Sequence, residues 1–331
     1  SQEKFADNML YIRENYNDIY SHGADIRTVS EDASKPERTL SVRIVAPTSQ
    51  QSNNQIVVNI PNVRKPIPLF ILFRALGVTS DKEIIEYCLL DLEANSSMVD
   101  LFIPSVHDAG KIFTQETALE YIKTFTKGHT TNYVLDILMN YFLPNIGELN
   151  FQQKAYFLGY IVNNLLLVFT KLEAPTDRDS FKFKRVEVPG ILLYDLFKEY
   201  FKLQQDNIKL RLDSEYNMKK SKTIYQNESF KDLITNNYER IFNERVVENG
   251  FKKAFKGNWG SEEHTKKLGA VQDLNRLSYN SFISHLRKIN LPMDSSAKVV
   301  KPRLLHGSQW GIIDPVDTPD GGNVGFHKHM A

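Results

Sequence analysis

The chain contains little of several residue types, and each shortage excludes a class of protein. Its only cysteine is Cys88, so no disulfide forms within its 331 residues. A lone cysteine fits a reducing compartment or a small buried apolar position. Lys and Arg number 41 and Asp and Glu 40, so the net charge of +1 gives no overall signal for nucleic acid, and local basic clusters would have to supply any binding. No apolar run approaches the roughly 20 residues of a membrane span, so we expect no membrane partner.

The rest of the composition is that of a globular protein, and 331 residues are enough for two or three domains. Hydrophobic residues make up 41% and charged residues 24%, which excludes a disordered or fibrous chain. The patterns of a small sheet are followed by a succession of helical patterns, which are in the majority. We therefore predict a multi-domain α+β fold that is predominantly helical.

The first half of the chain predicts a small sheet followed by helices. Residues 1–12 are typical of a turn entering a strand, and residues 15–34 are polar enough to predict a loop. Residues 38–46 and 54–58 are rich in β-branched side chains and predict a hairpin with a polar turn between them. Helical spacing of apolar residues then predicts helices over Pro66–Gly77, Lys82–Leu92, Glu116–Phe125, Asn132–Phe142 and Phe151–Phe169.

The second half begins with a charged break in the helical pattern at Asp177–Arg185, where four of nine residues are basic. This segment fits either a phosphate-facing turn, through Arg178, Lys182, Lys184 and Arg185, or an ordinary solvated turn. A long helix is predicted over residues 188–222. A second helical segment over residues 230–255 is predicted to break at Gly250.

Proline and glycine recur throughout residues 301–329, which excludes a long helix or strand there. We predict a rigid polar loop that carries Arg303, Asp317 and Asn323, with Trp310 buried beneath it. Loops of this kind usually serve a ligand.

This loop resembles the signature of the second-largest subunit of multisubunit DNA-directed RNA polymerases, called β in bacteria. The shared positions run Arg303-x-Leu305-His306-x-x-Gln309-Trp310-Gly311, then Pro315-x-x-Thr318-Pro319-x-Gly321-x-x-x-Gly325. The chain departs from the family pattern at Asp314, which replaces Cys, at Asp317 and Asp320, which replace Glu, and at His329, which replaces Asn. These departures suggest a divergent copy, such as one from a large DNA virus.

The resemblance extends along nearly the whole chain and implies a domain organisation. Residues 1–12 resemble the end of the first half of the family's protrusion, residues 13–187 a helical lobe with a small antiparallel sheet, and residues 188–256 the returning protrusion. Residues 257–331 resemble a mixed fork region, which the family continues further. We therefore read the chain as a fragment of a longer polypeptide.

Polymerases of this family hold an RNA–DNA hybrid through contacts to the backbone and shape of the hybrid. The resemblance therefore implies which residues lie near nucleic acid or nucleotide. They are Gln272, Arg276, His285, Arg287, Lys288, Arg303, Asp317 and Asn323. Each also has a purely structural reading, such as a buried, hydrogen-bonded role for His285. We further expect Asp317 to orient the Arg303 guanidinium, which would contact a phosphate at two points.

The carboxylates and histidines of the final loop do not match a metal site. Asp314, Asp317 and Asp320 are spaced by three, unlike the alternate ligands of a calcium loop, and the histidines lack cysteine partners. Two-metal nucleotidyl transfer needs a tight acidic cluster, and the sequence has none. The resemblance implies that Mg²⁺ is held by the partner largest subunit, so we expect no catalytic residue and no cofactor here.

The sequence therefore predicts a part of a DNA-directed RNA polymerase that is inactive alone. The resemblance implies that it shapes the DNA cleft and lines the RNA–DNA hybrid. The implied partners are the largest subunit, smaller polymerase subunits, template DNA and the hybrid. The implied location is intracellular, in the nucleus or, for a viral protein, in the host cytoplasm or virion. The alternative is a free-standing nucleic-acid-binding or scaffolding protein without polymerase activity.

Overall fold

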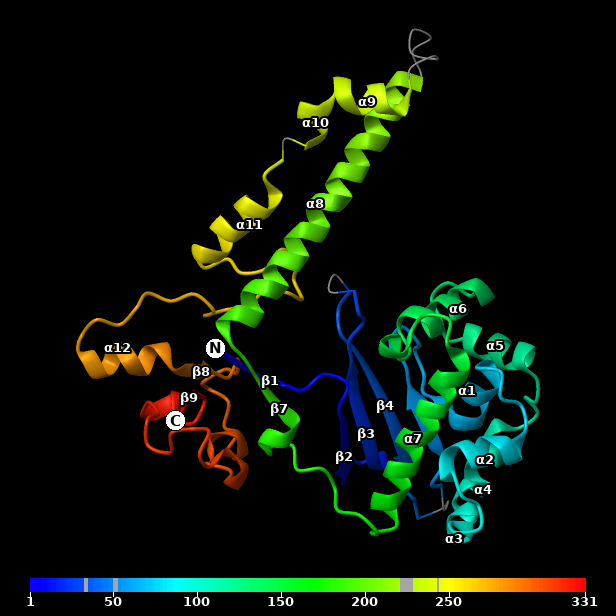
Figure 1. The fold of residues 1–331 in the computed structure, drawn as a ribbon. Helices are drawn as coiled ribbons and strands as arrows, with labels where there is room; N and C mark the ends of the chain where they lie inside the picture. Colours follow the sequence, from blue (N-terminus) through cyan, green and yellow to red (C-terminus); the bar gives the residue numbers. More distant parts are fainter. Residues whose placement is uncertain (33–34, 50–52, 221–228, 243) are drawn as a thin grey trace. The chain divides into compact units, whose positions relative to one another are not determined.

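The computed structural model describes residues 1–32, 35–49, 53–220, 229–242 and 244–331. These residues form two compact units, one of residues 6–31 and 37–178 and one of residues 1–5, 32–36 and 179–331. Each unit combines one sheet with several helices, which confirms the predicted α+β, multi-domain class (Figure 1). None of the described helices combines the length and apolar character required to span a bilayer.

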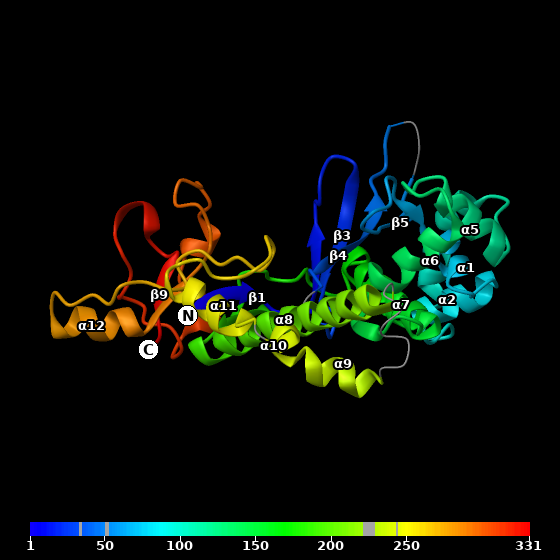
Figure 2. The same ribbon diagram turned by 90° about the horizontal axis from the view of Figure 1, so that it is seen from above.

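The first unit is built on a five-stranded antiparallel sheet in the order β2-β3-β4-β5-β6. Alternate residues of the strands, such as Ala24 and Ile26 in one and Val42 and Ile44 in the next, are buried on one face. Figure 2 shows the same ribbon from above, with β3, β4 and β5 labelled. The strands are β2 (Leu10–Glu14), β3 (Tyr20–Thr28), β4 (Arg38–Val45), β5 (Ile56–Asn59) and β6 (Ile67–Pro68).

Helix α7 (Phe151–Phe169) packs against β2 and β3 and is buried along one face, as its 3–4 spacing predicts. The helices around it share one apolar core with the sheet. They are α1 (Leu69–Ala75), α2 (Asp81–Leu89), α3 (Ser96–Val99), α4 (Ile103–Ala109), α5 (Gln115–Lys123) and α6 (Thr131–Asn140).

Buried Lys154 on α7 shows how this core satisfies a helix end. Its ammonium donates to the carbonyls of Leu138, Met139 and Phe142, at 2.7, 3.0 and 2.8 Å, where α6 ends. These carbonyls lack intrahelical partners, so the lysine acts as an internal cap. Burial lowers the pKa of Lys154 to about 8.

The second unit is built on a four-stranded sheet in the order β7-β1-β8-β9. Strand β1 pairs antiparallel with β7 and parallel with β8, and β8 pairs antiparallel with β9. The sheet thus joins four segments that are far apart in the sequence. The strands are β1 (Gln2–Phe5), β7 (Lys184–Glu187), β8 (Lys288–Asn290) and β9 (His327–His329).

The helices of this unit include a long α8 (Pro189–Lys220), which α11 (Val246–Phe255) accompanies (Figure 1). Leu192, Leu196 and Tyr200 of α8 form a small core with Ala254 and Trp259. The remaining helices are α9 (Phe230–Asn236), α10 (Tyr238–Phe242) and α12 (Tyr279–Leu286), and short 3-10 turns lie at 181–183, 301–303, 307–309 and 321–323.

Several sequence predictions are wrong. The polar segment 15–34 contains the nine-residue strand β3, although its residues 33–34 lie outside the described part. The helical break predicted at Gly250 falls instead after α9 and α10, and α11 runs through Gly250. A Cβ at Gly250 would lie 2.5 Å from the Tyr200 ring, so this glycine allows close helix packing. The helices α3 and α4 were not predicted.

Other predictions differ at their ends. The helix expected from Pro66 begins at Leu69, because Ile67 and Pro68 pair with β5. Residues 50–52 of the expected hairpin turn and residues 221–222 of the expected long helix lie outside the described part.

Candidate nucleic-acid interface

The four-stranded sheet is held together by a buried carboxylate between two lysines. Glu3 of β1 forms ion pairs of 2.8 Å with Lys184 of β7 and with Lys328 of β9. All three side chains are almost fully buried. Burial opposes ionisation of Glu3, but the two ammonium groups outweigh it and hold its pKa below the ordinary value. The base of the segment between β8 and β9 is thereby fixed by charge as well as by strand pairing.

A second buried carboxylate fixes the loop of residues 257–269. Glu187 of β7 pairs with Lys4 at 3.3 Å and with Lys267 at 2.6 Å. On the other side of the loop, Glu199 accepts hydrogen bonds from the backbone of Ser261 and the hydroxyl of Thr265, at 2.9 and 2.6 Å. The loop is therefore bound to both the sheet and α8.

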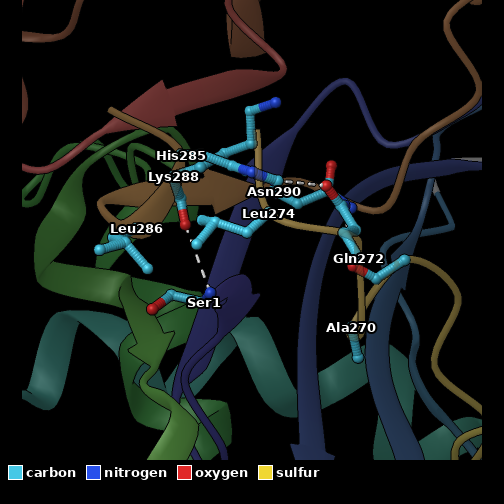
Figure 3. Close-up of a pocket in the computed structure, with 9 residues that line it drawn as sticks. Ser1, Ala270, Gln272, Leu274, His285, Leu286, Lys288 and Asn290 are labelled. Atoms are coloured by element: carbon cyan, nitrogen blue, oxygen red, sulfur yellow. Dashed lines mark hydrogen bonds between the residues drawn. The ribbon is translucent and has the colours of Figure 1, made fainter. Parts of the chain in front are cut away.

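Between this loop, β8 and α12 lies a small polar pocket of about 170 Å³ (Figure 3). Three residues predicted from the sequence, Gln272, His285 and Lys288, contribute to its walls. The other lining residues are Ser1, Gly269, Ala270, Leu274, Leu286 and Asn290. The structure thus brings together residues from the segment before α12, from α12 and from β8.

The hydrogen bonds of His285 define its tautomer. The backbone N–H of Asn275 donates to His285 Nδ1 at 3.0 Å, so Nδ1 carries no proton. In the neutral ring the proton is then on Nε2, which donates to Gln272 Oε1 at 3.0 Å (Figure 3). Gln272 Nε2 in turn donates to the carbonyl of Gly269 at 2.9 Å. The last turn of α12, which begins with a capping box at Ser278, carries His285.

The segment between β8 and β9, residues 291–326, is closed by Arg303. Its five N–H groups all donate to backbone carbonyls and its guanidinium stacks on Phe326. The acceptors are the carbonyls of Ser295, Ala297, Val299, Gly322 and Val324, at 2.6–3.2 Å. In this arrangement no N–H of Arg303 remains for a phosphate, since an arginine has five donors.

The expected contact between Asp317 and Arg303 is wrong. Ser284 of α12 donates to Asp317 Oδ2 at 2.7 Å, and Nδ1 of buried His329 lies 2.7 Å from the Asp317 carbonyl. Asp317 therefore ties α12 to β9. Asp314, where the family has Cys, accepts from the backbone N–H groups of Val316 and Asp317, which lowers its pKa. The departure at Asp314 thus stabilises a local turn.

The remaining predicted residues lie at the surface or in the sheet. The side chains of Arg276, Arg287 and Asn323 are exposed. In the predicted phosphate-facing turn, Lys182 and Arg185 are exposed but Lys184 is buried against Glu3, so its ammonium has an internal partner. Arg178 belongs to the other compact unit.

The prediction that Trp310 is buried is also wrong, because 77% of it is exposed. The loop is filled instead by Phe326 and Ile313, which are buried. Sequence reasoning missed Phe326, Glu3 and Glu187 as organising residues. An acidic residue in each of two short strand-like segments was the available signal, but nothing in the sequence pairs them with their lysines.

The residues that the structure describes contain no group of three His, Cys, Asp or Glu side chains arranged to hold a metal ion. Asp314 and Asp317 are occupied by the turn and by Ser284. These residues therefore do not fit the Mg²⁺ that nucleotidyl transfer requires.

Comparison with known proteins identifies the family. A model described as RNA polymerase Rpb2, domain 2, matches residues 26–187, and one described as RNA polymerase Rpb2, domain 3, matches residues 272–331. The chain belongs to the family of second-largest RNA polymerase subunits. The resemblance inferred from the loop of residues 303–325 is thereby confirmed.

Curated relatives match along the chain. The DNA-directed RNA polymerase II subunit RPB2 of Encephalitozoon cuniculi is 34% identical over 343 residues, covering 100% of this chain and 28% of the relative. Subunit 2 of the same enzyme from Arabidopsis thaliana is 34% identical over 345 residues, with the same coverage. The archaeal subunit Rpo2N of Methanocaldococcus jannaschii is 31% identical over 296 residues, covering 87% of this chain and 56% of the relative.

The chain therefore spans about 28% of the length of the eukaryotic relatives it matches. These relatives are named as polymerase subunits, so the alternative of a free-standing scaffolding protein is not favoured. They are cellular proteins and give the expected viral source no support.

Proposed function

We propose that this chain is part of a DNA-directed RNA polymerase and serves template-directed RNA synthesis without supplying the catalytic residues. The observation that carries the proposal is the likeness to polymerase II subunits along all 331 residues. The chain's own contribution is to shape the DNA cleft and to line the RNA–DNA hybrid.

The proposed interface lies on the part of the second unit that surrounds the polar pocket. Cationic and amide side chains bind the nucleic-acid backbone through phosphate and sugar oxygens, which positions a duplex without reading its sequence. The candidates are Gln272, Arg276, Arg287, Lys288 and Asn323. Arg303 and Asp317 act in this proposal by holding the loops, because their side chains bind other parts of the protein.

The domain assignment completes the proposal. Residues 1–12 and 188–256 are assigned to the protrusion, 13–187 to the lobe and 257–331 to the fork. Arg178, Lys182 and Arg185 are further candidates for phosphate contact. We propose that the largest subunit holds Mg²⁺ and is the main partner, alongside smaller subunits, template DNA and the hybrid. The likeness to polymerase II subunits favours a nuclear location.

Affinity purification tests the proposed assembly. The full-length protein that contains this chain, tagged and isolated from its native cells, should carry a largest polymerase subunit in an equal molar amount, as measured by mass spectrometry. Isolation without any polymerase subunit would contradict the proposal.

Salt dependence tests the proposed interface within that complex. Binding to an RNA–DNA scaffold should weaken as salt rises, because bound cations release counterions from the phosphates. The change Lys288→Ala should reduce the slope of log affinity against log salt by about one. Lys82→Ala, on an exposed α2 residue of the other unit, is the control and should leave the slope unchanged.

A further inference from the structure

Both the oxygen and the nitrogen of the Gln272 amide form hydrogen bonds within the protein, and these leave one N–H of the amide available to a ligand. Its Oε1 accepts the Nε2 proton of His285, and its Nε2 donates to the Gly269 carbonyl. A carbonyl can only accept, so the amide nitrogen must face Gly269, and the two contacts agree on the orientation. One N–H of the Gln272 amide then remains to be donated.

His285 holds this orientation together with Gly269, because only one tautomer of the ring satisfies both of its neighbours. The N–H of Asn275 requires an unprotonated Nδ1, and this places the proton of the neutral ring on Nε2. If Nδ1 carried the proton instead, it would face the Asn275 N–H, and Nε2 could no longer donate to Gln272. The backbone N–H of Asn275 therefore sets the tautomer of His285, and this tautomer directs an N–H donor at the Gln272 amide oxygen.

Both partners are positioned by the fold around the pocket. His285 lies in the last turn of α12, which Ser284 also joins to Asp317 at 2.7 Å. Gln272 follows the loop that Lys267 binds to Glu187. Gln272 is exposed and His285 is half-buried, so the amide is accessible while the ring that orients it is shielded.

We propose that His285 is a positioning residue that fixes Gln272 to donate its free amide N–H to a backbone oxygen of the bound nucleic acid, a phosphate or a ribose hydroxyl. A freely rotating amide would present its oxygen to a phosphate half of the time and would be repelled. The inference rests on the proposed function, because it requires nucleic acid at this face.

Substitutions of His285 separate the two hydrogen bonds. In His285→Asn the amide replaces Nδ1, so it keeps the Asn275 contact but does not reach Gln272. In His285→Gln the amide reaches the position of Nε2, so it keeps the Gln272 contact and loses that with Asn275. Gln272→Ala removes the proposed donor. Each variant is assembled into the complete polymerase and placed on a template with an RNA–DNA hybrid, and the half-life of the complex is measured after a salt challenge.

Gln272→Ala should shorten the half-life by about fivefold, which is the effect of losing one hydrogen bond. His285→Asn should shorten it by about twofold, because an amide that turns freely still presents its N–H half of the time. His285→Gln should restore most of it. Adding His285→Asn to Gln272→Ala should change nothing further, because the two residues act on one contact.

The proposal is overturned if His285→Asn and His285→Gln shorten the half-life equally, or if the two changes are additive, since His285 would then act only on local structure. It is also overturned if Gln272→Ala has no effect while the unmodified complex synthesises RNA, a result that leaves the proposed function intact. A complex that contains the unmodified chain and makes no RNA would instead contradict the proposed function.

Discussion

The guanidinium of Arg303 lies 3.8 Å from the centre of the Phe326 ring. Phe326 is buried next to β9, whereas Arg303 ends the 3-10 turn at residues 301–303, thirteen residues after β8. The stacked pair therefore joins residue 303, within the first half of residues 291–326, to the last residue of that segment. Arg303 at the start of the signature therefore has a structural role, although its position in the sequence suggested phosphate binding.

Arg303→Lys should loosen this segment. Lysine has three donors at one point and cannot reproduce five N–H groups directed at carbonyls from two loops. We expect a loss of about 1–3 kcal/mol of local stability, measured as faster amide hydrogen exchange in residues 295–303 and 321–326. The same change at exposed Arg276 is the control, and equal exchange in both variants would contradict the structural role.

Two glycines with the same backbone conformation provide a matched test of packing. Gly325 has φ +74°, and a Cβ there would lie 2.3 Å from the Arg303 carbonyl oxygen, whereas Gly311 has φ +77° and open space around it. Both changes to alanine should cost about 1–2 kcal/mol for the left-handed conformation. Gly325→Ala should cost about 3 kcal/mol in addition because the loop backbone must move. Urea unfolding measures both, and equal costs would show that the close approach is absent.

Glu3→Gln should leave two buried lysines without their shared carboxylate. We expect a loss of about 3 kcal/mol, measured by urea unfolding at pH 7. Exposed Glu262→Gln is the control. The pKa of Glu3 in the folded chain lies below its ordinary value of 4.5, so its stabilisation is present above that pH and is lost as the pH falls through the folded-state value. If the Glu3→Gln variant is as stable as the control, the ion pairs of Glu3 do not stabilise the sheet.

Lys154 should give the unit of residues 6–31 and 37–178 an unusual alkaline response. Its pKa is about 8 in the folded chain and 10.5 ordinarily, so between these values the unfolded chain binds the proton that the folded chain has released. Raising the pH through this interval should therefore increase the free energy of unfolding, by about 1–3 kcal/mol.

Hydrogen exchange of amides in α6 and α7 at pH 7 to 10, corrected for intrinsic rates, measures this response. Lys154→Met should abolish it and should also lower stability at pH 7, because the α6 carbonyls lose their donors. A rise of equal size in Lys154→Met would assign it to other groups.

The sequence was most informative where a pattern is local and repeated. The wide apolar stripe of Phe151–Phe169 predicted α7 with its observed bounds, and the β-branched segments predicted β4 and β5. Strand β3 was not predicted, because its outward residues are polar and its core residues include small Ala24 and polar Thr28. Its assignment depends on pairing with both β2 and β4, which no local pattern reveals.

The candidate site could be predicted only as a set of residues. The family resemblance drew attention to Gln272, His285 and Arg303, but not to what each binds. The partners of Arg303 are backbone carbonyls, which any residue supplies, and the partners of Glu3 are lysines about 180 and 325 residues away. Such contacts arise from the tertiary fold, so composition and spacing do not encode them in a readable form.

Template-directed RNA synthesis tests the central claim most directly. The full-length protein that contains this chain is tagged, and the complex purified through the tag is given template DNA, Mg²⁺ and labelled ribonucleotides. The account predicts template-dependent RNA in this sample, loss of that activity when the tagged protein is depleted, and none from residues 1–331 alone. RNA synthesis that remains entirely in the depleted extract, with none in the purified complex, would contradict it.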